Sequence, residues 1–418
     1  MSNLNLQKLS ELCTLYSGGT PSTSNESYWN GNLNWMSSGE TSNKLIYGTK
    51  LKISEKGVAE SSTRLAHSGD TVVATAGEGK TRGQTSYLLT DTYVNQSIVV
   101  LEADKTKIDN KFLFYAVSNS YNRMRALSDA AGIRGSLPCK LLNNFEINTF
   151  NLDIENKIGQ FLFNIDLKIE NNNKINTELE SLAKTIYDYW FLQFEFPNEE
   201  GKPYKSSGGK MVWNEELKRK IPEGWASENF GKLFSSQAGF AFKSTDWVEK
   251  GFPVLTIKSI QNNCQVDMSQ ASFISNFEDK HLKYKVRNGN IIFAMSGNTI
   301  GKIGVIASKE SNIFINQRVL IIKTTSEDLA YIYFLFNDKA MQNNIRQKGA
   351  NSAQPNISEE SLRAIKVCIP QEAILNKYNK LCKKFFDVII QNNIENSELS
   401  SLRDFLLPML MNGQVQFK

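Results

Sequence analysis

The residues that most suggest catalytic chemistry form a glycine-rich run, Ala74-Thr75-Ala76-Gly77-Glu78-Gly79-Lys80-Thr81, similar to a loop that binds phosphates. Such a loop follows a strand, opens a helix and needs a carboxylate elsewhere to hold Mg²⁺. A strand-like run does precede this segment. The residues after it, Arg82-Gly83-Gln84-Thr85-Ser86, indicate a turn into another strand. A P-loop-like nucleotide-binding protein that uses the Gly77–Thr81 loop stays open as an alternative, which the pattern does not favour.

The sequence offers little for other kinds of catalysis. Histidine-based acid–base chemistry would rest on His67 and His281, and the five cysteines form no C-x-x-C pair suited to zinc. No Pro-Pro pair supplies the loop typical of methyltransferases that act on exocyclic amines. Glu278-Asp279-Lys280 is the nearest approach to a nuclease site and indicates an exposed turn. We therefore expect no catalytic site, no bound metal and no cofactor.

The composition is typical of a globular protein. The chain has 418 residues, 40% of them hydrophobic and 22% charged, which suffices for two ordinary domains. No apolar run approaches the roughly 18 residues that a membrane-spanning helix needs, and the first residues lack the blocks of a signal peptide. We expect no membrane association and a cytoplasmic location. Because the net charge of +5 is mild, any surface that binds nucleic acid must come from local clusters of Lys and Arg.

The strongest signal is an internal repeat. Ser68–Ala74 matches Asn288–Ala294 at a spacing of 220 residues, and Tyr93–Val100 matches Phe314–Ile321 at 221. Further matches near the end of each half return to the spacing of 220. Several matches in order at a nearly fixed spacing indicate a tandem duplication of about half the chain.

Each half reads as short β-rich runs punctuated by glycine and closed by one long helix. The predicted fold is α+β: a β-rich domain followed by a long helix, present twice, with the two helices packed as an antiparallel coiled coil. A polar segment rich in Gly, Pro and Ser separates the halves and indicates a linker. The expected boundaries are domain 1 at 1–153, helix 1 at 154–195, the linker at 196–225, domain 2 at 226–372 and helix 2 at 373–412.

The two predicted helices share an a/d heptad seam. Both seams are interrupted at the same place by two asparagines, Asn172 and Asn176 in the first helix and Asn392 and Asn396 in the second. A buried Asn fixes register when it finds a partner, so we expect these four to face one another. A helix of about 35 residues is roughly 50 Å long. Used as a spacer between two different readers, it predicts a bipartite, non-palindromic DNA site with an unread gap.

Short motifs then connect the chain to a known family. They are Leu9-Ser10-Glu11-Leu12, Ser17-Gly18-Gly19-Thr20-Pro21-Ser22 and Tyr28–Trp35 near the start, Tyr187-Asp188-Tyr189-Trp190-Phe191 and Ile221-Pro222-Glu223-Gly224-Trp225 at the junction, and Leu406–Val415 at the end. With the duplication, they resemble the specificity subunits of type I restriction–modification systems over essentially the whole chain. The second copy departs from the Gly-Gly-Thr-Pro pattern at Glu228–Leu233.

The resemblance implies a non-catalytic subunit that reads a bipartite, asymmetric site in double-stranded DNA. It also implies two modification (methyltransferase) subunits as partners, which two restriction subunits can join. Methylation, translocation and cleavage would then belong to the partners. The recognition subunit of another restriction–modification class remains an alternative.

Base readout needs Arg, Lys, Asn or Gln on loops. Asn95-Gln96 and Asn316-Gln317 lie in strand-like runs and are interpreted as structural hydrogen-bonding residues. The candidates for DNA binding are Lys80, Arg82, Gln84, Arg123, Arg125 and Arg134 in the first half, and Lys243, Lys258, Asn298, Lys302, Arg346, Lys348 and Asn351 in the second.

Overall fold

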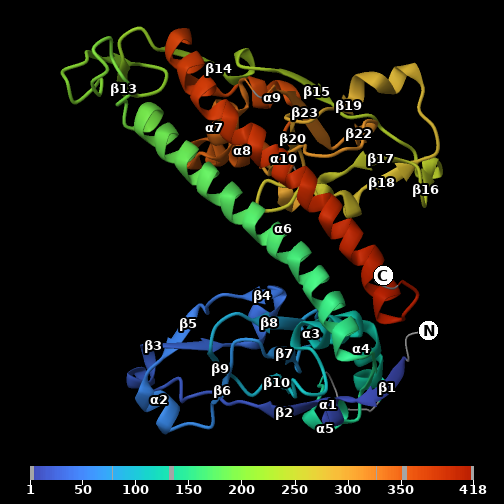
Figure 1. The fold of residues 1–418 in the computed structure, drawn as a ribbon. Coiled ribbons are helices and arrows are strands. Elements are labelled where there is room, and N and C mark those ends of the chain that lie inside the picture. The colour runs from blue at the N-terminus through green and yellow to red at the C-terminus, as the bar shows by residue number, and fades with distance from the viewer. Residues whose placement is uncertain (1–3, 78, 131–135, 326, 351–354, 416–418) are drawn as a thin grey trace. The chain divides into compact units, whose positions relative to one another are not determined.

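The chain folds into two compact units (Figure 1). The structure is a computed structural model that describes residues 4–415 apart from 78, 131–135, 326 and 351–354. Unit 1 comprises Met1–Lys168 and Leu399–Lys418, and unit 2 comprises Ile169–Glu398. Two long helices, α6 (Leu152–Tyr187) and α10 (Glu372–Met411), therefore contribute residues to both units. None of the helices in the described residues is long and apolar enough to cross a membrane.

Unit 1 contains three sheets, with strand orders β2-β10-β7-β8-β4, β5-β3-β9-β6 and β1-β11. Parallel pairs, β3 with β9 and β4 with β8, make the two larger sheets mixed. The strands are β1 (Asn5–Lys8), β2 (Cys13–Ser17), β3 (Trp29–Met36), β4 (Leu45–Ile46), β5 (Leu51–Ile53), β6 (Arg64–Ala66), β7 (Thr71–Ala74), β8 (Thr85–Leu88), β9 (Thr92–Val94), β10 (Ile98–Ala103) and β11 (Glu146–Thr149).

The central strands of unit 1 are buried on both faces because each face lies against a different apolar cluster. Since side chains alternate along a strand, Val73 and Val99 enter the cluster under the helices, whereas Val72, Ile98 and Val100 enter the cluster that includes Met36 of β3. These residues form the near-continuous apolar runs seen in the sequence. The helices of unit 1 are α1 (Leu9–Leu12), α2 (Glu55–Ala59), α3 (Asn110–Asn119), α4 (Tyr121–Ala130) and α5 (Cys139–Asn143).

Unit 2 repeats this arrangement, with sheets β15-β23-β20-β21, β16-β18-β17-β22-β19 and β14-β24. Its central strands again divide their side chains, because Phe293 and Leu320 enter one cluster while Ile292 and Ile321 enter another. The predicted tandem duplication is confirmed. The elements are β14 (Ala226–Asn229), β15 (Ser235–Ala238), β16 (Trp247–Val248), β17 (Phe252–Leu255), β18 (Ser272–Ile274), β19 (Lys285–Val286), β20 (Ile291–Ala294), β21 (Ile303–Val305), β22 (Ile313–Ile315), β23 (Val319–Lys323), β24 (Lys366–Ile369), α7 (Leu329–Asn337), α8 (Lys339–Gly349) and α9 (Glu359–Arg363).

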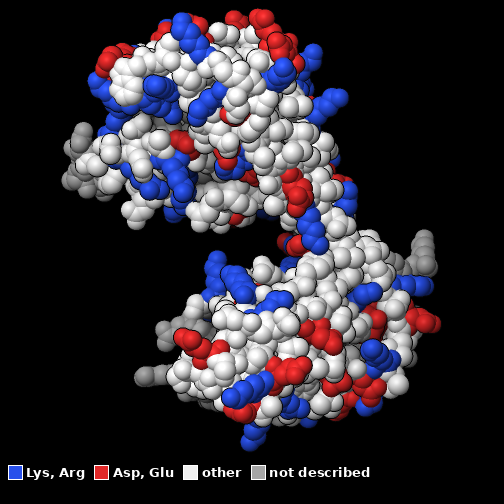
Figure 2. All heavy atoms as spheres, turned by 90° about the vertical axis from the view of Figure 1, so that its left-hand side faces the viewer, with Lys and Arg blue, Asp and Glu red and all other residues white. Residues whose placement is uncertain are grey.

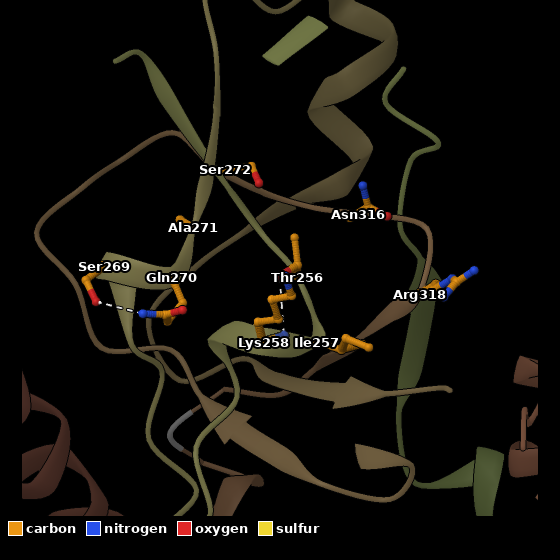
Figure 3. Close-up of a pocket in the computed structure, with 9 residues that line it drawn as sticks. All are labelled: Thr256, Ile257, Lys258, Ser269, Gln270, Ala271, Ser272, Asn316 and Arg318. Atoms are coloured by element: carbon orange, nitrogen blue, oxygen red, sulfur yellow. Dashed lines mark hydrogen bonds between the residues drawn. The ribbon is translucent and has the colours of Figure 1, made fainter. Parts of the chain in front are cut away.

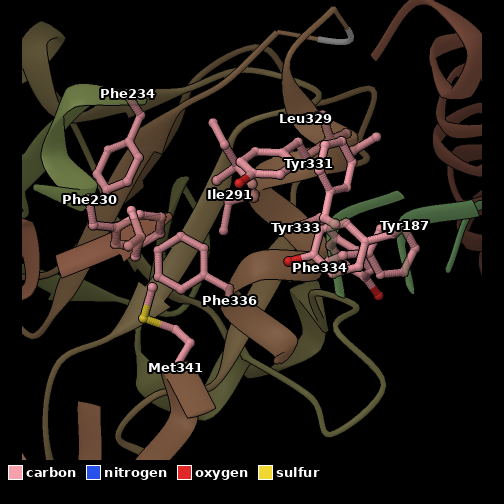
Figure 4. Close-up of a cluster of buried hydrophobic side chains, with 14 of the residues drawn as sticks. Tyr187, Phe230, Phe234, Ile291, Leu329, Tyr331, Tyr333, Phe334, Phe336 and Met341 are labelled. Carbon is pink, nitrogen blue, oxygen red and sulfur yellow. The ribbon is translucent and has the colours of Figure 1, made fainter. Parts of the chain in front are cut away.

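The segment expected to be a linker carries an antiparallel hairpin, β12 (Met211–Asn214) with β13 (Arg219–Pro222). Phe196 and Trp225 flank the hairpin and stack at a centroid distance of 5.2 Å. Both belong to the aromatic core of unit 2, which Figure 4 shows around Tyr187 and the side chains of α7. Because most of this segment is polar, the sequence analysis did not identify Phe196 and Trp225 as residues that attach it to the core. The first long helix also ends differently, since α6 passes into a π-helical turn at Asp188–Leu192.

The two long helices pair antiparallel, as predicted. In unit 2 the Tyr378 hydroxyl of α10 donates to the Ala183 carbonyl of α6 at 3.1 Å. In unit 1 the later residue Arg403 meets the earlier residue Asp166. Seam positions such as Ile158 and Leu162 are buried, as the heptad pattern requires.

A buried ion pair fastens the end of α10 within unit 1. The Asp166 carboxylate accepts from the Arg403 guanidinium at 2.5 Å and from the Tyr115 hydroxyl at 2.6 Å. Lys44 lies 3.7 Å from the same carboxylate, and burial lowers the pKa of its ammonium group. Because the Asp166 side chain is only 4% exposed, these partners take the place of water around its carboxylate.

Arg403→Leu is expected to destabilise the chain by about 3–5 kcal/mol, because it leaves a buried carboxylate without its cation. Adding Asp166→Asn should recover most of this loss, since the amide oxygen can still accept from Tyr115. Chemical denaturation of the full chain measures both effects. Asp404→Asn is the control: Asp404 pairs with Arg403 but is exposed, so its loss should cost less than about 1 kcal/mol. Equal losses for Arg403→Leu and Asp404→Asn would contradict the assignment.

Candidate nucleic-acid interface

The β7–β8 loop of unit 1 is held in place by α4. The Tyr121 hydroxyl donates to the Lys80 carbonyl at 2.8 Å, and Arg125 donates to the Gly79 carbonyl at 2.5 Å. Gly83 has a φ of +86° and packs against the Tyr121 ring, which favours glycine at this position. The loop is therefore ordered by a helix some forty residues further along the chain.

Three charged candidates of unit 1 differ in what they can reach. Arg82 is buried and donates to Ser128 Oγ at 2.8 Å and Asp129 Oδ1 at 2.7 Å. Arg123 lies over the Phe145 ring at 4.9 Å and donates to the Glu146 carbonyl, so the structure does not bring it to the loop. The Lys80 side chain is exposed and makes no hydrogen bond or ion pair with the described residues.

The remaining candidates of unit 1 are Gln84 and Arg134. Gln84 Oε1 accepts weakly from Thr41 Oγ1 at 3.4 Å, a residue of the turn after β3. Arg134 lies outside the described residues. Lys80 and Gln84 are thus the described candidates at this loop whose polar atoms are least committed to the fold.

The glycine-rich run is not a phosphate-binding loop. It connects β7 directly to β8, which pair antiparallel, so β7 is not followed by the helix that such a loop opens. The strand-and-turn interpretation of Arg82–Ser86 is confirmed, and the nucleotide-binding alternative loses its structural basis.

The corresponding loop of unit 2 joins β20 to β21 and is held by α8 in the same way. Gln342 of α8 donates to the Gly301 carbonyl at 3.0 Å. Asn298 is exposed and Lys302 is half-buried on this loop. Arg346 and Lys348 are exposed in the last turn of α8, whose Gly349 lies against Ile300. The structure therefore brings these four candidates to one end of the unit, and Asn351 lies outside the described residues.

The two remaining candidates of unit 2 lie on segments that reach the same end of its sheets. Phe240, just before Lys243, bridges to Asn316, and the parallel pair β17–β22 places Thr256 near Asn316. Lys258 follows Thr256 in a short 3₁₀ turn. Both lysines are exposed.

A cavity of about 470 Å³ opens beside Lys258 (Figure 3). Arg318 also lines it, although the sequence analysis did not single out this residue. The matching residue of the first copy is Ser97, so the difference between the repeats was the available signal. The lining residues are Thr256, Ile257, Lys258, Ser269, Gln270, Ala271, Ser272, Asn316 and Arg318.

A second concentration of cations lies at the opposite end of the unit 2 sheets. Lys283, Lys285, Arg287 and Lys323 line a groove of about 720 Å³ along α10. None of the four forms an ion pair with a described residue. The strand register places Glu102 of unit 1 at the position of Lys323, so this basic groove has no equivalent in the first copy. Figure 2 shows basic side chains gathered over parts of the visible face of both units, with acidic ones between them.

The four asparagines of the helix seam meet in unit 2. Asn172 donates to Asn396 at 2.9 Å, and Asn392 donates to Asn176 at 2.8 Å. Asn176 also donates to Asn393 at 3.0 Å. Asn172 and Asn176 are 1% and 8% exposed, so these bonds replace water around buried amides.

Residues that the sequence analysis considered for catalysis make packing contacts, hydrogen bonds or ion pairs within the fold. His281 is buried beside Phe240, and its Nδ1 accepts from the Glu278 backbone N–H at 3.0 Å. Lys280 pairs with Glu278 in an exposed turn. Across the described ranges, no group of three or more His, Cys, Asp or Glu side chains is arranged to hold a metal ion.

Comparison with known proteins shows which family the chain belongs to. The family model described as "Type I restriction modification DNA specificity domain" matches residues 1–181 and 222–402, that is, both copies of the repeat. The chain belongs to this family. It is a DNA-recognition subunit of a restriction–modification system and not one of the catalytic subunits.

Curated relatives and a solved structure agree with this assignment. The chain is 26% identical to the type I restriction enzyme MjaIX specificity subunit of Methanocaldococcus jannaschii, covering 98% of this chain and 93% of that one. It is 20% identical to the HindI specificity subunit of Haemophilus influenzae, covering 80% and 84%. The S subunit of M. genitalium has a TM-score of 0.63 at 17% identity, covering 98% and 96%, and thus shares the fold.

Arg82→Ala is expected to destabilise the chain by about 1.5–3 kcal/mol, because it removes charge-assisted hydrogen bonds inside the fold. Lys80→Ala should change stability by less than about 0.5 kcal/mol, since the side chain is exposed. Chemical denaturation distinguishes the two. A stability loss for Lys80→Ala as large as that for Arg82→Ala would contradict the assignment of Arg82 to the interior and of Lys80 to the surface.

Proposed function

We propose that the chain reads a bipartite, asymmetric DNA sequence, one half with each copy of the repeat, and directs modification subunits to it. The observation that carries this proposal is that the two copies share the pairing and register of their central strands but carry different side chains on the loops that join them. There, the β7–β8 loop carries Lys80, and the β20–β21 loop carries Asn298 and Lys302. A shared fold with different reading residues is what two different half-sites require.

The proposed domains are target-recognition domain 1 at 1–153 and target-recognition domain 2 at 226–372. The segments 154–195 and 373–412 then act as spacer helices, with 196–225 joining the halves. The α-helical part of the first spacer contains 36 residues, which corresponds to about 54 Å. Two readers on such helices favour an unread gap between the half-sites.

The proposed DNA contacts come from the loops at the reading end. The proposed contacts among the described residues are Lys80, Gln84, Lys243, Lys258, Asn298, Lys302, Arg346 and Lys348. Arg134 and Asn351 stay in the proposal. Arg82, Arg123 and Arg125 are proposed to position the fold instead, because the first donates inside the unit and the others donate to backbone carbonyls. Phosphate contacts are expected to outnumber base contacts.

The proposed partners are two methyltransferase subunits, which two restriction subunits can join. The curated relatives are named as specificity subunits of type I restriction enzymes, and this naming supports the class of partner. The paired helices α6 and α10 are the proposed docking elements. Residues such as Leu182, Leu402 and Phe405 are exposed on them and could contribute apolar contacts.

The four seam asparagines are proposed to fix the register of the helix pair. A buried amide without a partner costs roughly 1–3 kcal/mol, so a shifted register that separates these side chains is disfavoured.

Methylome sequencing of cells that express the chain with its modification subunit tests the function. The expected result is one methylated motif made of two unlike half-sites separated by bases of any identity. A short contiguous motif, or a palindromic one, would contradict the two-reader proposal. Cells that express the modification subunit alone provide the control.

Replacing Asn172, Asn176, Asn392 and Asn396 together by Leu tests the register proposal. Without the polar layer, the helices are expected to adopt an altered register or to associate between molecules, visible by crystallography and light scattering. The control is Asn171→Ala with Gln391→Ala, at exposed positions of the same helices. A monomeric four-Leu variant with residue 172 still opposite residue 396 would refute this role.

A further inference from the structure

The turn before β23 in unit 2 has the same backbone as the turn before β10 in unit 1. The Asn316 backbone N–H donates to the Leu255 carbonyl at 2.9 Å, as that of Asn95 does to Met36 at 3.1 Å. The next strand begins in both cases with a bond back to the same Asn carbonyl. Because the two turns make the same backbone hydrogen bonds, the side-chain differences between them are not needed to form the fold.

The side chains of the two turns have different partners. In unit 1, Asn95 Oδ1 accepts from the Ser97 N–H at 3.1 Å, and Gln96 Oε1 accepts from Thr20 Oγ1 at 2.5 Å. In unit 2, Asn316, Gln317 and Arg318 make no side-chain hydrogen bond or ion pair with the described residues. The structural interpretation of the Asn-Gln pair therefore fits the first copy and not the second.

The neighbouring 3₁₀ turn also carries different residues in the two copies. In unit 1, Glu40 is 7% exposed and accepts from the backbone N–H groups of Ser37 and Lys50. Ser259 takes the corresponding place in unit 2 and bonds back to Thr256. The cavity of about 470 Å³ opens beside this turn in unit 2 and is lined by Thr256, Ile257 and Lys258 of the turn.

The cavity presents unused donors and acceptors. Lys258 stands where the first copy has Gly39, and its ammonium group has no partner among the described residues. Among the described residues, the Gln270 side-chain amide bonds only to Ser269 Oγ, at 3.5 Å. Figure 3 shows Lys258 and Gln270 on one side of the cavity and Asn316 and Arg318 on the other.

We propose that this cavity reads a guanine in the half-site bound by the second copy, with Arg318 and Lys258 donating to the O6 and N7 acceptors of the base. Arg and Lys are the side chains that match this pair of acceptors, and the amides of Asn316 and Gln270 can address a neighbouring base. The inference rests on the proposed function. It differs from a phosphate site, which needs cations alone.

The test replaces Arg318 by Ser, the residue that the first copy has at this position. The full-length variant and the unaltered chain each select from duplex DNA randomised at both half-sites, and the bound pools are sequenced. We expect one position of one half-site to lose its guanine preference by roughly 5- to 150-fold. The other half-site and the gap should stay unchanged. Lys258→Gly should weaken the same position.

Two controls make the result specific. Lys323→Glu places the first copy's residue at the opposite end of the sheets and should leave every base preference intact. Thermal unfolding should not distinguish Arg318→Ser from the unaltered chain, because the side chain is exposed and unpaired. Equal weakening of all sequences by Arg318→Ser, or unchanged preferences, would overturn the proposal. An unaltered chain that selects no bipartite site would instead count against the proposed function itself.

Discussion

The fold depends on one constraint, the satisfaction of polar side chains inside the seam between α6 and α10. An apolar seam tolerates a shift by one heptad, because one Leu or Ile replaces another at little cost. This seam contains buried amides in unit 2 and a buried carboxylate in unit 1 that find partners across it, and the proposed role of the amides is to disfavour a shifted register. The end of α10 from Leu399 onward belongs to unit 1, where Leu410 and Met411 enter its core.

The β-rich parts follow from a simpler rule. Side chains that alternate along β7, β10, β20 and β23 fill two apolar clusters in each unit, so the strands are apolar throughout and their register is strongly specified. This specification leaves the loops at the strand ends free to differ. Helices α4 and α8 then order those loops with different residues, Tyr121 and Arg125 in one copy and Gln342 in the other.

Much of this architecture could be predicted from the sequence, because a duplication shows every element twice. The heptad seam and its asparagines recur in both halves, and the antiparallel pairing followed from their positions. What the sequence could not show are contacts between distant residues. Arg82 has the appearance of a surface cation until Ser128 and Asp129 are placed beside it. Arg318 was concealed within a strand-like match, and the hairpin at Met211–Pro222 within a polar segment whose aromatic anchors lie at its ends.

The composition of unit 1 has a consequence for how the chain folds during synthesis. Leu410 and Met411 are buried in the same cluster as Leu9 and Phe112, so the earlier part of unit 1 lacks some of its core until α10 is made. Unit 2 is continuous in sequence, so its core does not depend on residues from a distant part of the chain. The usual order, in which the N-terminal domain folds first, is therefore reversed for the final closure. The segments around Leu9 and Leu410 are far apart in sequence, and their closure is expected to be the slow step of folding.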